Sequence, residues 1–334
     1  MIAVRPDAAA PGTPGGPGAS TEVARAFVEE RRGRATALGK GAAEHVQDPE
    51  RLTDALRSAL EALADPAYRE GQQFVAPGIG PTFGVRLPLL TALGRGFRAA
   101  TRRDSSTTLL LAADRLLREP EGELHWFAFG ILEVTLGRET ERTWQLLRRA
   151  GREAADWISV DSLAHAFGRG ILAEPYRWAE LEQLAYSPSR WERRLVGSSI
   201  ATIPFVNRTL GRRPDVARHG LEILGQLMGD AEPDVQKALA WAYRSMALVD
   251  RAATTATLDH ESEIARATGD GYRAWVIRDA LVKLDEADAA RIRARLEGLR
   301  RRPGAPSTSI AAATAARFAS DLPLGMPVPE PPLT

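Results

Sequence analysis

Four residues of this chain carry groups suited to stabilising a cation and binding a phosphate. Trp157 and Asp161 are four residues apart, so on a helix their side chains lie on the same face. Arg194 and Trp241 occupy comparable places in the two segments that follow. A carboxylate can stabilise a developing positive charge, an aromatic face attracts a cation, and a planar guanidinium suits phosphate. We expect these four side chains to converge on one surface.

Two further cations extend this set, and each member also has a plainer interpretation. Arg193 directly precedes the first arginine, and Arg244 lies three residues beyond the second tryptophan. In the plainer interpretation Asp161 caps or solvates a helix, both tryptophans are core residues, and Arg193 is a solvated neighbour of Glu192. His165, four residues after Asp161, invites an acid–base pairing, but we expect a surface or packing histidine there.

Composition excludes several classes of site. The chain has 334 residues and no cysteine, which excludes disulfides, thiolate metal sites and cysteine nucleophiles. Its five histidines form no ligand pair at short helical spacing, so we expect no metal and no cofactor. No apolar run is long enough to span a membrane, and the N-terminus lacks the pattern of a secretory signal. We therefore expect a cytoplasmic protein with no membrane partner.

The charge balance gives only a weak indication of partners. The 44 basic residues nearly balance the 43 acidic ones, so no large positive excess points to nucleic acid. A neutral total can still hide one basic face. Only Lys40, Lys237 and Lys283 are lysines, and the other basic residues are arginines. Either a GC-rich genome or a need for phosphate-binding side chains explains this bias.

The elements that must position these residues are helices. No alternating strand pattern occurs. Two series of leucines repeat at helical spacing: the first is Leu52, Leu56, Leu60 and Leu63, and the second is Leu109, Leu111, Leu116 and Leu117. Four segments each follow a less aromatic helix and a short turn: 157–167, 190–203, 233–246 and 271–284. Successive units begin roughly 35–45 residues apart, which is the period of stacked helical hairpins. We predict an all-α fold, an αα-hairpin solenoid with a concave binding face.

The ends of the chain differ in composition from its middle. Residues 1–20 are rich in Pro, Gly and Ala, and we predict a disordered lead there. Residues 303–334 form a Pro-rich, largely irregular tail with one possible helix at Ile310–Ala319. Residues 21–302 between them are predicted to form a single helical-repeat domain.

Several motifs resemble those of the AlkD-like DNA alkylation repair glycosylases, which are built from HEAT-like repeats. They are DWISVDSLA (156–164), RWERRLVG (190–197), DVQKALAWAYRSM (234–246) and, earlier, FGVRLP (83–88). The resemblance covers roughly residues 80–285 and leaves the helices before about residue 75 unassigned. It implies that Asp161 is catalytic with Trp157 as its aromatic companion. It also implies that Arg194 and Trp241 bind DNA, and we add Arg193 and Arg244 as further contacts.

The implied chemistry is consistent with a lone carboxylate. An N3- or N7-alkylated purine is already cationic, so it departs as a neutral base without a general acid. The sugar becomes oxocarbenium-like, and Asp161 would stabilise it and position the attacking water. Trp157 and Trp241 would pack against the deoxyribose, and Arg194 would hold a flanking phosphate.

With this resemblance, we expect a monomeric DNA glycosylase that acts on cationic alkylpurines in duplex DNA and associates with the nucleoid when bound. We expect the surface around Arg194 and Arg244 to be locally positive, because phosphate contacts dominate affinity for DNA. Two alternatives remain open. One is a non-catalytic HEAT-like module that binds DNA or protein, and the other is a helical scaffold unrelated to DNA.

Overall fold

A computed structural model of the chain describes residues 19–76, 78–305 and 308–319. Within these ranges it contains α-helices, two short 3-10 helices and no β-strand, which confirms the predicted all-α fold. The predicted N-terminal lead lies outside the described residues up to position 18, and α1 (Ala19–Ala43) begins directly after it. In the C-terminal tail, α16 (Ile310–Ala319) coincides with the predicted helix, whereas residues 320–334 lie outside the described part.

Contacts within the chain divide it into two compact units, where the sequence predicted one domain over residues 21–302. Unit 1 is Met1–Glu70 with Phe83–Arg103, and unit 2 is Gly71–Thr82 with Asp104–Thr334, each as far as it is described. In unit 1, α2 (Pro49–Leu63) buries its predicted leucine stripe. There α1 crosses α4 (Leu87–Ala100) so closely that a Cβ on Gly39 would strike the carbonyl of Leu93. This crossing gives unit 1 a core of its own. The helix α3 (Pro66–Val75) spans the division.

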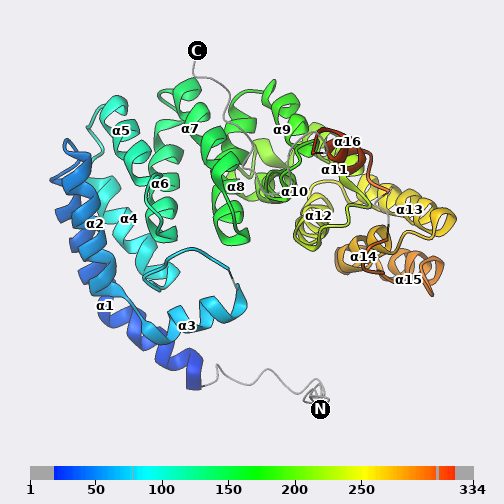
Figure 1. The fold of residues 1–334 in the computed structure, drawn as a ribbon, viewed down its shortest axis with the longest axis horizontal. Helices are drawn as coiled ribbons and strands as arrows, with labels where there is room; N and C mark the ends of the chain where they lie inside the picture. Colours follow the sequence, from blue (N-terminus) through cyan, green and yellow to red (C-terminus); the bar gives the residue numbers. More distant parts are fainter. Residues whose placement is uncertain (1–18, 77, 306–307, 320–334) are drawn as a thin grey trace. The chain divides into compact units, whose positions relative to one another are not determined.

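Unit 2 contains a stack of helical hairpins. Their first helices, here called the outer row, are α5 (Ser106–Leu116), α7 (Thr140–Glu153), α9 (Arg177–Ala185), α11 (Pro214–Leu227) and α13 (Arg251–Thr268). Their second helices, the inner row, are α6 (Gly122–Thr135), α8 (Trp157–Ala173), α10 (Arg190–Val206), α12 (Pro233–Met246) and α14 (Gly271–Ala280). Figure 1 shows the two rows along opposite edges of unit 2. From α7 onward the outer helices begin 37 residues apart, at 140, 177, 214 and 251, which confirms the repeat predicted from the sequence.

The inner helices pack directly on one another. The hydroxyl of Thr202 on α10 donates to the carbonyl of Ala164 on α8 at 2.9 Å. On the other side of α10, a Cβ built on Gly197 would lie 2.9 Å from Ala238 of α12, so these two backbones can approach only because residue 197 lacks a side chain. Two further helices of unit 2 pack on the outer row: α15 (Glu286–Arg295) on α13 and α16 on α11.

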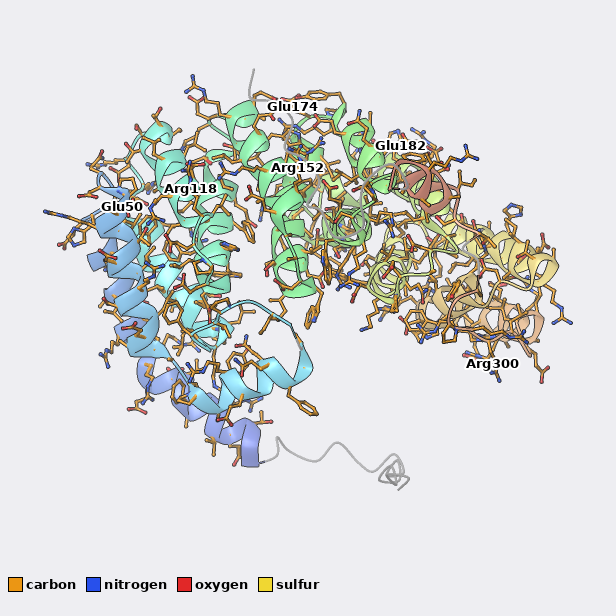
Figure 2. All side chains as sticks on the ribbon, in the orientation of Figure 1. Glu50, Arg118, Arg152, Glu174, Glu182 and Arg300 are labelled. Atoms are coloured by element: carbon orange, nitrogen blue, oxygen red, sulfur yellow. The ribbon has the colours of Figure 1, made fainter. Side chains whose placement is uncertain are left out.

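One predicted apolar stripe is partly wrong. Leu109, Leu116 and Leu117 are buried in unit 2, but Leu111 is 59% exposed, because a residue two positions along a helix points to its other side. Charged residues such as Arg152 on α7 and Glu182 on α9 are exposed on the outer row (Figure 2). No helix among the described residues combines the length and the apolarity needed to cross a bilayer.

Candidate functional site

Capping residues fix where the inner helices begin, and therefore which side chains face outward. The carboxylate of Asp156 accepts hydrogen bonds from the backbone N–H groups of Ile158 and Ser159 at 2.8 and 2.9 Å, which starts α8 at Trp157. The hydroxyl of Ser189 caps α10 in the same way. A proline at the first position starts α12. Asp161 consequently lies one turn into α8.

Asp161 is held by two side chains of α10. Nε of Arg194 donates to its Oδ1 at 3.1 Å, and Nη2 donates to its Oδ2 at 2.7 Å. The hydroxyl of Ser198, one turn further along α10, donates to Oδ1 at 2.6 Å. Bidentate pairing of this kind fixes the plane of the carboxylate. The arginine side chain is 6% exposed, whereas that of Asp161 is 22% exposed and remains accessible to solvent.

Arg194 connects three inner helices. Besides its two bonds to α8, its Nη1 donates to the carbonyl of Asp234 on α12 at 2.7 Å and lies 3.9 Å from the Asp234 carboxylate. Its guanidinium carbon lies 5.9 Å from the ring centroid of Trp157. The sequence analysis expected this arginine to hold a phosphate. In the structure three of its nitrogens are instead committed to the protein.

The predicted residues come together in part. Trp157, Asp161 and Arg194 form one cluster, here called the Asp161 cluster. Trp241 is half-buried on α12, seven residues after Asp234, so it shares that residue's helix face two turns away. His165 is exposed one turn beyond Asp161, as expected for a surface histidine.

Arg193 points away from this cluster, because successive residues on a helix point about 100° apart. Its Nε donates to Asp230 at 2.8 Å, and its Nη1 donates to the carbonyls of Ser187 and Pro188 at 2.9 and 3.1 Å. The Arg193 side chain is only 8% exposed. This geometry disagrees with the predicted DNA contact. Arg244 is 27% exposed and forms an ion pair with Asp279 of α14.

Sequence reasoning missed two partners of Asp161 and Arg194. Ser198 had a usable signal, since it follows Arg194 by four residues and shares its helix face. Asp234 acts mainly through its main-chain carbonyl, which no residue pattern reveals.

Ion pairs join neighbouring helices of the inner row. Each of three arginines faces a carboxylate of a neighbouring inner helix: Arg169 of α8 lies 3.5 Å from Glu133 of α6, Arg194 pairs with Asp161, and Arg244 pairs with Asp279. These pairs connect α6 to α8, α8 to α10 and α12 to α14. These three guanidinium groups thus connect the stacked inner helices.

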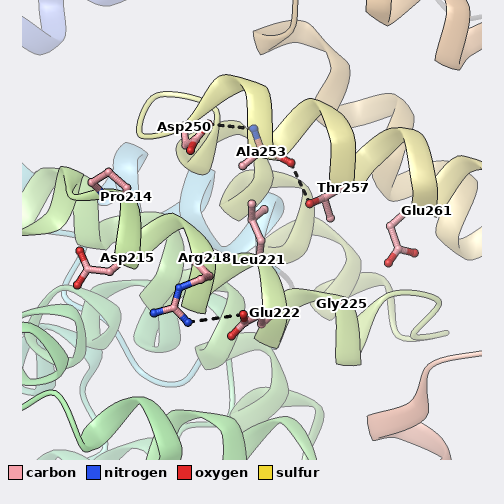
Figure 3. A pocket seen from close by; sticks show the side chains of 10 residues that line it. All are labelled: Pro214, Asp215, Arg218, Leu221, Glu222, Gly225, Asp250, Ala253, Thr257 and Glu261. Atoms are coloured by element: carbon pink, nitrogen blue, oxygen red, sulfur yellow. Dashed lines mark hydrogen bonds and ion pairs between the residues drawn. The ribbon is translucent and has the colours of Figure 1, made fainter.

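A groove of about 700 Å³ lies elsewhere, between the outer helices α11 and α13 (Figure 3). Its lining includes Asp215, Arg218 and Glu222 of α11, with Asp250 and Glu261 on the other side. None of the predicted site residues lines it. Among the described residues, no group of three or more potential ligands is placed to hold a metal ion.

Comparison with known protein families identifies the family of this chain. The sequence model of a family described as DNA alkylation repair enzyme matches residues 56–284, which is more than half of the chain and includes the whole Asp161 cluster. No curated protein matches the chain.

Proposed function

The chain belongs to the DNA alkylation repair enzyme family, and from that premise we propose that it is a DNA glycosylase. It hydrolyses the N-glycosidic bond of cationic N3- or N7-alkylated purines in duplex DNA. One observation carries this proposal: an aspartate of the inner row is held rigidly by Arg194 and Ser198, yet keeps 22% of its side chain exposed.

The bond broken is the one between C1′ of the sugar and the purine nitrogen. Its electron pair moves to the base, which is already cationic and therefore leaves neutral. C1′ becomes oxocarbenium-like, and water adds there, loses a proton and leaves an abasic site. Asp161 stabilises the sugar cation and orients the water. Trp157 and Trp241 offer aromatic faces to the same cation.

The ion pair with Arg194 limits how strongly Asp161 can stabilise the sugar cation in the transition state. An isolated carboxylate and a cation ~4 Å apart interact by about 4 kcal/mol at an effective dielectric near 20. Arg194 already shares the charge of Asp161, so the stabilisation of the transition state is smaller. What remains is preorganisation, because the carboxylate does not reorient when charge develops on the sugar.

The test is direct. The protein is incubated with a duplex that carries a single N7-methylguanine, and free base is quantified by chromatography. We expect release by the wild type and a ~10²-fold lower rate for Asp161→Asn, which keeps the shape and removes the charge. The matched control is Asp215→Asn on the outer row, which should release base at the wild-type rate.

Two results would contradict the proposal. Release by Asp161→Asn at the wild-type rate would remove the carboxylate from the mechanism. No release from any duplex carrying a cationic alkylpurine would favour a non-catalytic HEAT-like module that binds DNA or protein along the same face.

A further inference from the structure

Phosphate recognition on the inner row needs a cation that the protein does not already use. Arg193, Arg194 and Arg244 are paired with Asp230, Asp161 and Asp279. For Arg194 to hold a phosphate it would have to leave a buried pair, and the carboxylate it left behind would be next to the incoming anion. The structure therefore argues against Arg194 as the principal phosphate contact.

Lys237 of α12 is placed differently. It is exposed, and within the described part of the chain its ammonium group makes no ion pair and no side-chain hydrogen bond. It lies three residues after Asp234 and four before Trp241, so the three side chains share one face of α12. Because the Asp234 carbonyl receives a bond from Arg194, this face adjoins the Asp161 cluster. A lysine on a flexible stem binds phosphate as a point charge and needs no fixed plane.

We propose that Lys237 is the phosphate contact of the Asp161 site, the role that the sequence analysis expected for Arg194. The proposal rests on the proposed function, since the phosphate is that of a DNA strand whose sugar faces Asp161. Arg194 then acts as a positioning residue for Asp161. The two cations then have different roles: the paired Arg194 orients the Asp161 carboxylate, and the unpaired Lys237 binds a phosphate of the DNA backbone.

The test measures binding without base release. The full chain is titrated with a fluorescein-labelled duplex, either undamaged or containing a tetrahydrofuran abasic analogue, by anisotropy between 50 and 200 mM KCl. For Lys237→Gln we expect about fivefold weaker binding at the lowest salt and a slope of log affinity against log salt that is shallower by ~0.9, the value for one lost phosphate contact. Lys237→Arg should keep both the affinity and the slope.

The matched control is Arg218→Gln, which removes one positive charge from the outer helix α11, where Arg218 lies 3.7 Å from Glu222. It should leave the slope unchanged. A wild-type slope in Lys237→Gln, or an equal loss of slope in Arg218→Gln, would overturn the assignment. Because the duplexes cannot be cleaved, this result is independent of the glycosylase assay: absence of base release refutes the reaction, and an unchanged slope refutes the role of Lys237.

Discussion

Two adjacent arginines of α10 make the same kind of ion pair in opposite surroundings. Arg193 lies 2.8 Å from Asp230, and their side chains are 8% and 1% exposed. Arg194 lies 2.7 Å from Asp161, and their side chains are 6% and 22% exposed. The arginines are equally buried, and only the carboxylates differ. Asp161 is therefore the more exposed of the two acids, although the residue types alone make the two pairs equivalent.

The other hydrogen bonds of Asp230 and Asp161 also differ. Oδ1 of Asp230 accepts from the backbone N–H of Glu232 at 2.9 Å, and its main-chain carbonyl accepts from Gln236 at 2.7 Å. Both contacts organise the turn that enters α12. Oδ1 of Asp161 instead accepts from Ser198, a side chain of the neighbouring inner helix. One pair closes a turn within the protein, and the other orients an acid on its surface.

The largest expected difference between the two pairs is in stability. Asp230→Asn leaves a buried guanidinium without its counter-charge and should lower the free energy of unfolding by about 3–5 kcal/mol. Asp161→Asn should lower it by less, about 1–2 kcal/mol, because water reaches that side and the Asp234 carboxylate stays 3.9 Å from Arg194. Urea unfolding of both variants measures the difference. Equal losses would show that the two pairs are energetically alike.

Substitutions of Arg193 and Arg194 should have different effects on the kinetics of base release. Arg194→Gln should lower kcat for base release by ~10-fold or more with little change in KM, because the orientation of Asp161 is lost while phosphate binding is kept. Arg194→Lys should not restore the rate, since an ammonium cannot reproduce the bidentate geometry. Arg193→Gln should destabilise the fold and leave kcat per folded molecule unchanged. A rise in KM as the main effect of Arg194→Gln would return the phosphate role to that residue.

Two adjacent serines of α10 also differ in whether they contact the Asp161 carboxylate. Ser198→Ala removes one hydrogen bond to the Asp161 carboxylate and should lower kcat about tenfold, the equivalent of one charge-assisted bond. Among the described residues, the buried hydroxyl of Ser199 has no hydrogen-bond partner, so Ser199→Ala should keep the rate and leave stability equal or higher. Base release and urea unfolding, measured on both variants, test this. A rate loss in Ser199→Ala as large as in Ser198→Ala would show that the effect is one of packing.

The sequence predicted the helices and the partners along each helix better than the contacts between helices. Period and turn residues located the hairpins and even α16, because both signals are local. The spacing of Trp157 and Asp161 correctly placed both on one helix face. The direction in which Arg193 and Arg194 point, however, depends on where Ser189 caps α10 and on which helix packs beside it. Composition also could not show that Arg169, Arg194 and Arg244 are paired with carboxylates of neighbouring inner helices.

The smallest expected effect concerns pH and the helix that carries Asp161. His125 of α6 is half-buried, with Nε2 2.5 Å from the carbonyl of Glu119. Burial lowers its pKa below the ordinary value of 6.5, and nearby Asp156, Glu153 and Glu121 only partly oppose this. Asp156 is the cap of α8, so protonation of His125 occurs close to the start of that helix.

The sign of the pH effect follows from proton binding. With its pKa depressed in the folded state, His125 binds fewer protons there than in the unfolded chain. Its contribution to stability is then fully present above about pH 6.5 and is lost as the pH falls toward the folded-state value. His125→Gln should therefore flatten the decline of unfolding free energy between pH 7 and pH 5, measured by urea unfolding at several pH values. His165→Gln, at an exposed position of α8, controls for the loss of a histidine. A decline in His125→Gln as steep as in the wild type would assign the acid sensitivity to groups other than His125.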